Sequence, residues 1–182
     1  MRLRTLMKST TKSLKKQTNK LLKVAYLGIG TNKGLREKNI LLALELLNKN
    51  PEIKISKISK LLKNPPQEGV KTGYFLNGAI KLLTTLNPTE LLRFCKRIER
   101  KLGRNIQSST HKKRPRTIDL DILFYENKII TTNKLIIPHP MLHKRYFVLI
   151  PLLEIGRNII HPVYKTSIGK LYNNFFESKK FA

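Results

Sequence analysis

Two aspartates stand close together in the stretch "RPRTIDLDILFY", residues 114–125, and they are the only aspartates of the chain. Successive side chains of an extended strand point to opposite faces, so Asp119 and Asp121 share one face, roughly 7 Å apart at about 3.3 Å per residue. Two carboxylates at that separation repel each other unless a cation lies between them. This spacing therefore predicts a cation site on the strand.

The other residues of this strand predict which face is buried. One alternating set is wholly apolar and is expected to face the core, namely Ile118, Leu120, Ile122 and Phe124. The aspartates share the opposite face with Thr117 and Leu123. The alternative is a pair of solvated or arginine-bridged surface acids. Against it, the chain holds 37 Lys and Arg but 11 Asp and Glu, so lysine fills most of its exposed positions, and a bulky apolar strand is a poor place for idle aspartates.

The types of residue around the aspartates indicate phosphate chemistry. Carboxylate oxygens suit Mg²⁺, which takes one or two carboxylates and completes its octahedron with water and substrate phosphates. Arg104, Arg114 and Arg116 would donate hydrogen bonds to phosphate oxygens. A nucleotide polyphosphate is the predicted ligand, although "GIGTNKG" has the wrong spacing for a Walker A or a Rossmann glycine motif.

The elements that must position this site are expected in the order β-α-β-β-α-β. Strands are predicted at residues 23–30, 52–63, 74–84 and 114–125, the second with a bulge or bend, and helices at residues 35–48 and 87–103. The second helix has a capping-box start at Asn87 and Glu90, and a stop at Gly103. This order predicts an α+β, ferredoxin-like fold in αβα layers, an antiparallel sheet with helices packed on it. Residues 137–155 add a proline-bracketed loop and a short helix.

Five motifs in order resemble the 6-hydroxymethyl-7,8-dihydropterin pyrophosphokinase (2-amino-4-hydroxy-6-hydroxymethyldihydropteridine diphosphokinase) family, from about Val24 to Pro162. They are "YLGIGTNKG", "GYFLNGAI", "IERKLGR", "RPRTIDLDILFY" and "IPHPMLHKRYFVLIPLLEI". The resemblance implies a ferredoxin-like fold and dependence on Mg²⁺, with two ions bound together with ATP. It also implies transfer of the β,γ-pyrophosphoryl unit of ATP to the hydroxymethyl group of the pterin, which releases AMP in a step of folate biosynthesis.

The resemblance also assigns site residues. Asp119 and Asp121 match the metal ligands of the family, and Arg104 and Arg116 match its catalytic arginines. The pterin pocket falls on Pro65, Phe75, Asn77 and Phe147, and the nucleotide contacts fall on Glu99, Arg104, Arg116, His139 and Arg145. Considered alone, Phe75 and Phe147 would be plain core residues, whereas an amide that interrupts an apolar strand needs a polar partner. His143 and His161 match nothing in the family pattern.

The basic loop of residues 104–116 departs from the family. Ile106 stands where a second arginine is usual, so ATP is expected to be held somewhat differently. Polar residues and five Lys or Arg residues make up most of this loop, which predicts a lid that closes when polyphosphate arrives.

The net charge of +26 first suggests nucleic acid as a partner. The basic residues are spread along the chain, however, as on a solvated lysine surface, and we expect no specific nucleic-acid partner. An RNA-recognition module is the competing interpretation, because it shares the β-α-β-β-α-β order. Its aromatic RNA-binding motif is missing from "NGAIKLLT".

Length and composition predict a single domain at residues 24–182. The resemblance implies that this domain is a pyrophosphokinase that acts on ATP and the pterin, and we expect a monomer without room for the further domains of fused relatives. Residues 1–23 hold eight basic residues and no acid, which fits a basic tail or an organelle presequence. One cysteine, Cys95, excludes an internal disulfide and is expected in the core. A cytoplasmic protein without a transmembrane segment is expected, with an organelle as the alternative if residues 1–23 are a presequence.

Overall fold

A computed structural model of the chain describes residues 21–66, 73–103 and 115–178. The predicted order of elements is confirmed. The sheet and its first two helices are β1 (Lys23–Thr31), α2 (Arg36–Asn48), β2 (Ile53–Ile58), β3 (Leu62–Asn64), β4 (Phe75–Thr84), α3 (Pro88–Lys101) and β5 (Asp119–Tyr125). The remaining elements are β6 (Ile130–Thr131), β7 (Ile136–Ile137), the 3-10 helix η2 (Leu142–Lys144), α4 (Tyr146–Gly156), β8 (Ile160–His161), β9 (Thr166–Ser167) and α5 (Ile168–Glu177).

The main sheet has the order β2-β4-β1-β5, and β3 also pairs with β4. Every pairing in it is antiparallel. The predicted bend in the second strand is confirmed, because the register shifts between Ile55 and Lys57 and the strand continues as β3. Since β4 lies between the parallel-running β1 and β2, the sheet has the split βαβ arrangement of a ferredoxin-like fold.

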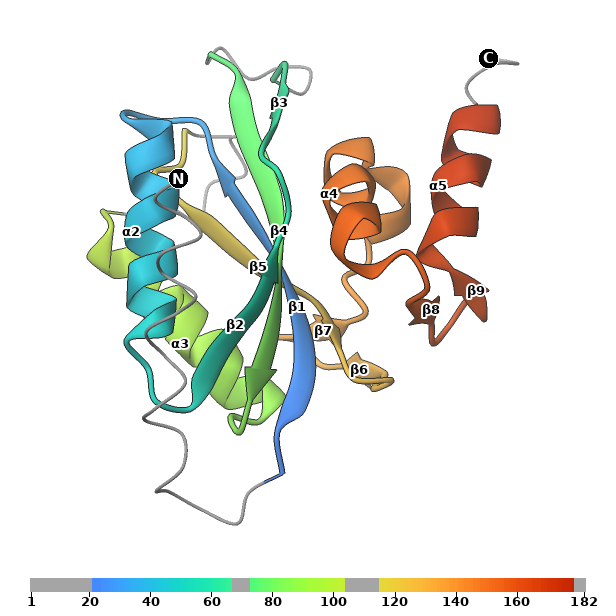
Figure 1. The fold of residues 1–182 in the computed structure, drawn as a ribbon, viewed down its shortest axis with the longest axis horizontal. Coiled ribbons are helices and arrows are strands. Elements are labelled where there is room, and N and C mark those ends of the chain that lie inside the picture. The colour runs from blue at the N-terminus through green and yellow to red at the C-terminus, as the bar shows by residue number, and fades with distance from the viewer. Residues whose placement is uncertain (1–20, 67–72, 104–114, 179–182) are drawn as a thin grey trace.

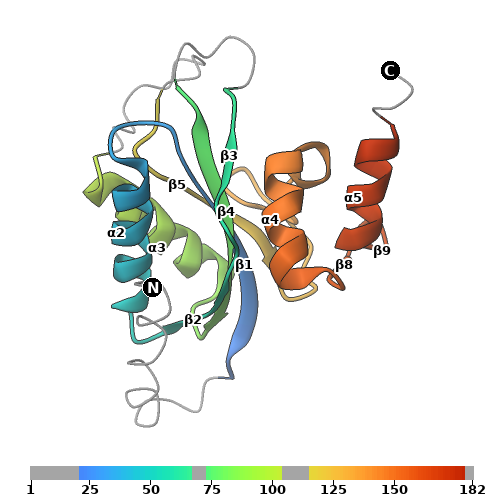
Figure 2. The same cartoon turned by 45° about the horizontal axis from the view of Figure 1, so that its top comes forward.

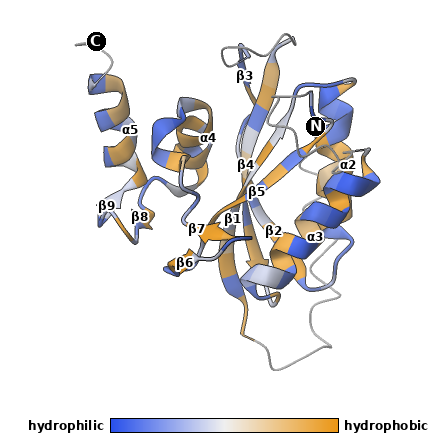
Figure 3. Cartoon of the chain, turned by 180° about the vertical axis from the view of Figure 1, so that it is seen from behind, coloured by the Kyte–Doolittle hydropathy of each residue, from blue (hydrophilic) through white to orange (hydrophobic). Residues whose placement is uncertain are grey.

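Helices cover both faces of this sheet (Figure 1). The helices α2 and α3 lie on one face, α4 lies on the other, and α5 packs on α4 away from the sheet (Figure 2). Hydrophobic residues follow the strands and α4, whereas the outward sides of α2 and α3 carry hydrophilic residues (Figure 3). The layered α+β architecture predicted from the sequence is thereby confirmed.

Each face of the sheet buries a separate hydrophobic core. The first core, beneath α2 and α3, includes Leu27, Leu44 and Leu120, each at most 2% exposed. The second core, beneath α4, includes Leu149 and Ile168, which are fully buried. Cys95 belongs to the first core, as predicted, and burial raises the pKa of its thiol to about 12.

The face predicted for Phe124 is wrong. Its ring lies in the second core together with Leu123, not in the first core with Leu120. Tyr26 pairs with Phe124 but Leu27 pairs with Ile122, so β5 holds one extra residue at this point. Such a bulge interrupts the alternation of side chains, which turns Phe124 to the other face.

The predicted start and stop of α3 are confirmed. The backbone N–H of Asn87 donates to the Glu90 carboxylate at 2.7 Å, and the N–H of Glu90 donates to the Asn87 side chain at 3.0 Å. Gly103 follows the helix with a φ of 87°, a conformation that glycine adopts without steric cost. These local contacts fix where α3 begins and ends.

The part of the chain after the proline-bracketed loop contains more helices and strands than predicted. The expected short helix is α4, but the sequence patterns did not reveal the β8–β9 hairpin or α5. Across the described ranges, none of the helices has the length and apolar character needed to cross a bilayer.

Candidate active site

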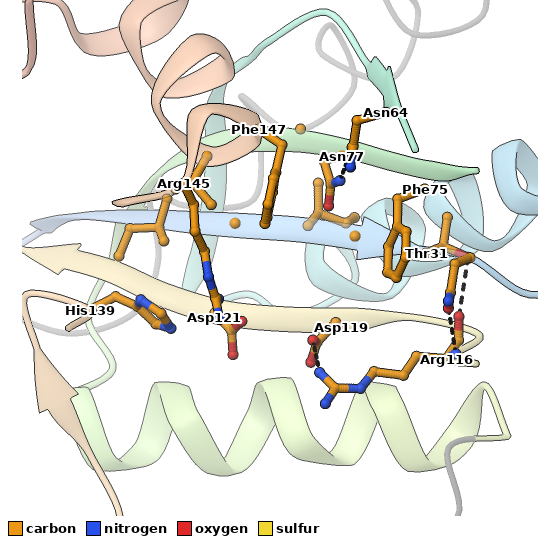
Figure 4. A pocket seen from close by; sticks show the side chains of 17 residues that line it. Thr31, Asn64, Phe75, Asn77, Arg116, Asp119, Asp121, His139, Arg145 and Phe147 are labelled. Atoms are coloured by element: carbon orange, nitrogen blue, oxygen red, sulfur yellow. Dashed lines mark hydrogen bonds and ion pairs between the residues drawn. The ribbon is translucent and has the colours of Figure 1, made fainter. Parts of the chain in front are cut away.

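A pocket opens on the α4 side of the sheet, and β1, β4, β5, the loop before η2 and the start of α4 line it (Figure 4). Eight of the residues predicted from the sequence lie around it, namely Phe75, Asn77, Arg116, Asp119, Asp121, His139, Arg145 and Phe147. They come from segments up to 72 positions apart in the chain. The fold therefore gathers most of the predicted site into one cavity.

Two glycines of β1 make the floor of this pocket. Gly30 pairs with Asn77 on one side and with Asp119 on the other, so these three residues form one row across the sheet. Gly28 pairs with Ala79 and Asp121 in the next row on the same face. A Cβ atom at Gly30 would meet Oδ1 of Asn77 at 2.6 Å, so a larger residue would displace that amide. The missing side chains leave space between the amide and the carboxylates.

The predicted pair of aspartates occupies one wall of the pocket. Asp119 and Asp121 both lie on the pocket face of β5, as their spacing predicts. The guanidinium of Arg116 forms an ion pair with Asp119, and the Arg116 side chain is 47% exposed. Acid and base are thus adjacent at an open end of the pocket, where an incoming anion could also reach Arg116.

A buried asparagine that the sequence reasoning missed holds the backbone of Arg116. Asn32 is 3% exposed, and its side-chain Oδ1 accepts a hydrogen bond from the Arg116 N–H at 2.6 Å. Its own N–H donates to the Arg116 carbonyl at 3.1 Å. These two bonds join Asn32, at the end of β1, to Arg116, which lies 84 positions later and shortly before β5. Asn32 therefore fixes where the Arg116 side chain starts.

His139 and Arg145 form the opposite end of the pocket. Nδ1 of His139 accepts the Met141 N–H at 3.2 Å, so the neutral ring carries its proton on Nε2. Burial lowers the pKa of His139, Asp121 acts to raise it and Arg145 acts to lower it. The Arg145 side chain is directed toward Asp121 (Figure 4), and its buried Nε has no hydrogen-bond partner among the residues that the structure describes. This end offers two N–H groups to an anion.

The amide of Asn77 has a side-chain partner. Its Nδ2 donates to Oδ1 of Asn64 at 2.6 Å, and Nδ2 of Asn64 donates to the Pro65 carbonyl at 2.9 Å. Asn64 is 4% exposed and also lines the pocket, although the sequence motifs did not single it out. The aromatic rings of Phe75 and Phe147 project from β4 and α4 into the same pocket (Figure 4).

Three predicted site residues do not line the described pocket. Pro65 is exposed beside it and accepts the bond from Asn64. Glu99 is fully buried beneath β5, on the face opposite the pocket, because it lies on the inward side of α3. A direct contact between Glu99 and the nucleotide stays a prediction, and the burial of Glu99 on the opposite face argues against it. Arg104 and the rest of the predicted lid up to residue 114 lie outside the described residues.

Comparison with known proteins supports the family that the motifs indicate. The sequence model of the family described as 7,8-dihydro-6-hydroxymethylpterin-pyrophosphokinase (HPPK) matches residues 26–157, which hold all the described pocket residues. The chain belongs to this family.

Curated members of the HPPK family are similar along most of the chain. The 2-amino-4-hydroxy-6-hydroxymethyldihydropteridine pyrophosphokinase of Aquifex aeolicus (strain VF5) is 44% identical over 140 residues, which are 77% of this chain and 84% of that protein. The protein of the same name from Bacillus subtilis (strain 168) is 39% identical over 136 residues, 75% and 80% of the two chains.

Solved structures share the fold at low sequence identity. Plasmodium falciparum HPPK-DHPS, wild type with pteroate, has a TM-score of 0.71 at 18% identity and matches 90% of this chain. A second structure, HPPK-DHPS in complex with substrates, has a TM-score of 0.68 at 17% identity. This chain spans 44% of each of those two chains. The likeness confirms the ferredoxin-like arrangement of the HPPK fold.

Proposed function

We propose that the chain transfers the pyrophosphoryl group of ATP to the hydroxymethyl group of 6-hydroxymethyl-7,8-dihydropterin, which yields the pterin diphosphate and AMP in folate biosynthesis. The observation that carries this function is the row Asn77–Gly30–Asp119 across the sheet. Its two ends are the Asn77 amide and the Asp119 carboxylate, on either side of a single pocket that Phe75, Phe147 and Asp121 also line. A flat polar heterocycle and a polyphosphate can therefore meet in the pocket.

The pterin side of the pocket has the chemistry that a flat, polar ring requires. Phe75 and Phe147 offer aromatic faces for stacking, and Asn77 offers its amide to the polar edge of the ring. The missing side chain at Gly30 makes room for the Asn77 amide on the pocket floor, since a Cβ atom there would meet Oδ1 of Asn77 at 2.6 Å. These residues would bind the pterin and orient its hydroxymethyl group toward β5.

The carboxylate side of the pocket fits Mg²⁺. The donor set is two carboxylates on one strand face, and the described residues hold no cluster of three or more His, Cys, Asp or Glu that could enclose a metal ion. That set suits Mg²⁺, which keeps water and substrate phosphates among its ligands. Asp119 and Asp121 would hold two Mg²⁺ ions that bind together with ATP. When bound, Mg²⁺ neutralises charge on the triphosphate and aligns it with the attacking oxygen.

The basic residues at the two ends of the pocket would hold the triphosphate itself. Arg116 approaches from the β5 end, and Arg145 and the Nε2–H of His139 approach from the α4 end. Guanidinium groups form short, charge-assisted hydrogen bonds to phosphate oxygens. With the nucleotide held at both ends, its β-phosphorus and the pterin hydroxyl would lie in a fixed arrangement, which lowers the entropic cost of the reaction.

We also infer that the enzyme acts as a monomer on two small molecules, because a single chain already supplies the amide, the aromatic rings, the carboxylates and the basic groups of the pocket. The buried thiol of Cys95 fits a reducing compartment such as the cytoplasm. An organelle presequence at residues 1–23 is the alternative; residues 1–20 lie outside the described ranges.

An assay of AMP release tests the proposed function. The protein is incubated with ATP and Mg²⁺, with and without 6-hydroxymethyl-7,8-dihydropterin, and the expected result is AMP formed only when pterin and Mg²⁺ are both present. Titration with a random RNA oligonucleotide at physiological salt is the comparison, with weak binding that falls steeply with salt expected. Absence of pterin-dependent AMP would overturn the proposal.

A further inference from the structure

We propose that Asn64 sets the polarity of the pterin pocket by fixing the orientation of the Asn77 amide, so that Asn77 turns its carbonyl oxygen toward the ligand. This inference rests on the proposed function and names a specificity-determining residue within it. Asn64 lies at the end of β3 and pairs across the sheet with Phe75, two positions before Asn77.

The orientation follows from a chain of hydrogen bonds that begins at a backbone carbonyl. The carbonyl of Pro65 can only accept, so the group of Asn64 that lies 2.9 Å from it must be the NH₂ group. The other end of the Asn64 amide is then its oxygen, which lies 2.6 Å from the Asn77 side chain. An oxygen needs a donor there, so the NH₂ group of Asn77 must face Asn64.

The last step places the remaining atom of the Asn77 amide. With its NH₂ group bound to Asn64, Asn77 turns Oδ1 over the floor of the pocket, 2.6 Å from where a Cβ atom of Gly30 would stand. Asn64 is 4% exposed, so water cannot easily replace its bonds. The pocket therefore offers an acceptor at this point, which selects a ring edge with N–H donors, as the amino and ring N–H groups of a pterin supply.

Reversal of the Asn77 amide would be costly because every hydrogen bond between Asn77, Asn64 and Pro65 would have to reverse with it. If Asn77 turned its oxygen toward Asn64, two oxygens would face each other unless Asn64 also flipped. A flipped Asn64 would then place its own oxygen against the Pro65 carbonyl. Each arrangement leaves a buried polar group unpaired, which is unfavourable. The backbone carbonyl of Pro65 thus determines the orientation of both amides.

Two substitutions of similar size separate this role from simple packing. Asn64→Asp keeps an oxygen toward Asn77, and its protonated carboxyl group can also donate to the Pro65 carbonyl in place of the amide. Asn64→Leu removes that acceptor and frees the Asn77 amide to rotate. Ser59→Ala is the matched structural control, because Ser59 supports β4 by accepting the Ala79 N–H at 2.9 Å without lining the pocket.

The experiment measures the dissociation constants of 6-hydroxymethyl-7,8-dihydropterin and of Mg²⁺-ATP separately by titration calorimetry. Asn64→Leu is expected to weaken pterin binding by about tenfold and to leave the ATP constant within about twofold. Asn64→Asp and Ser59→Ala are expected to keep pterin affinity within about threefold of the wild type. If Asn64→Leu does not fold, Asn64→Ala makes the same comparison, and circular dichroism establishes the fold of each variant.

Two results would overturn the role of Asn64 while the proposed function stands. One is unchanged pterin affinity in the Asn64→Leu protein, and the other is equal loss in the Leu and Asp variants. In either case the wild type would still release AMP only in the presence of the pterin, so the proposed function would stand. A wild type that binds no pterin would instead overturn the proposed function and this inference together.

Discussion

The carboxylate of Glu99 accepts a hydrogen bond from the backbone N–H of Leu120 at 2.8 Å, and Leu120 is the residue between the two aspartates of the pocket. Glu99 is fully buried and also accepts a bond from Lys96 Nζ at 2.9 Å. A charged acceptor of this kind makes a stronger bond than a neutral one. The contact ties α3 to β5 at the point where the strand presents Asp119 and Asp121.

Replacement of Glu99 tests whether it positions β5 or contacts the nucleotide. Glu99→Ala leaves the buried Leu120 N–H unpaired, so we expect a loss of about 1–3 kcal/mol in the free energy of unfolding and a reduced kcat. Glu99→Gln keeps an acceptor and should lose less of both. Urea denaturation and AMP release measure the two effects. Weaker ATP binding in a Glu99→Ala protein of unchanged stability would instead favour a direct nucleotide contact.

The two carboxylates of β5 are expected to act chiefly in catalysis. Asp119→Asn and Asp121→Asn keep the size of the side chain but remove a charged Mg²⁺ ligand, so we expect each to lower kcat by at least about 100-fold. Pterin affinity should change little. Glu45→Gln, on the exposed side of α2, removes the same charge far from the pocket and is the control. Activity within tenfold of wild type in both aspartate variants would exclude the metal assignment.

Asn32 is expected to work through Arg116. Asn32→Ala removes the acceptor of the Arg116 N–H, so the guanidinium should lose its fixed starting point and kcat should fall by about tenfold. Lys33→Ala, at the exposed neighbouring position, is the control. A double-mutant cycle with Arg116→Ala separates the explanations, because residues that act together are not additive. If kcat of the double variant fell by the product of the two single-variant fold-changes, Asn32 would act independently of Arg116.

Local patterns predicted much of this fold. The strands at residues 23–30 and 74–84 and the capping box of α3 were predicted from residues within a few positions of one another, and these predictions are confirmed. The reversed face of Phe124 could not be read in the same way, because the bulge depends on how β5 pairs with β1. The apolar residues of β5 keep a regular alternation through the bulge, whereas the bend of the second strand was predicted because its alternation breaks.

The candidate site was predicted best where a residue faces the pocket directly. Asp119, Asp121 and Asn77 interrupt apolar patterns, and this made them visible. Asn32 and Asn64 also end apolar strands, which is the one signal they carry, but their partners lie in other segments of the chain. The burial of Glu99 likewise depends on the packing of α3 beneath β5. Residues that support a site are harder to predict because only the tertiary contact defines their role.

His161 is expected to make the stability of the protein depend on pH near neutrality. It is 4% exposed, its ring stacks on Tyr164 with centroids 4.4 Å apart, and it contacts Phe124 edge to face at 5.5 Å. Its Nδ1 accepts the backbone N–H groups of Val163 and Tyr164, both at 3.3 Å. A proton on Nδ1 would break both bonds. Burial, and then His143, lowers the pKa of His161.

The sign of the effect follows from this lowered pKa. The unfolded chain has an ordinary histidine pKa of about 6.5, so below that pH the unfolded state binds a proton that the folded state resists. The free energy of unfolding should therefore fall as the pH drops below about 6.5 toward the folded pKa, by at most about 1.4 kcal/mol per pH unit for one proton. Above that range the contribution of His161 is fully present.

The test compares wild type with His161→Asn by urea denaturation between about pH 5.5 and 7.5, above the range in which ordinary carboxylates titrate. The asparagine oxygen can accept in place of Nδ1 but does not titrate, so the variant should lose part of the pH dependence. His139 and His143 also have lowered pKa values and shift stability in the same direction, so only the difference between the two proteins reports His161. Parallel curves for the two proteins would show that His161 does not take up the proton.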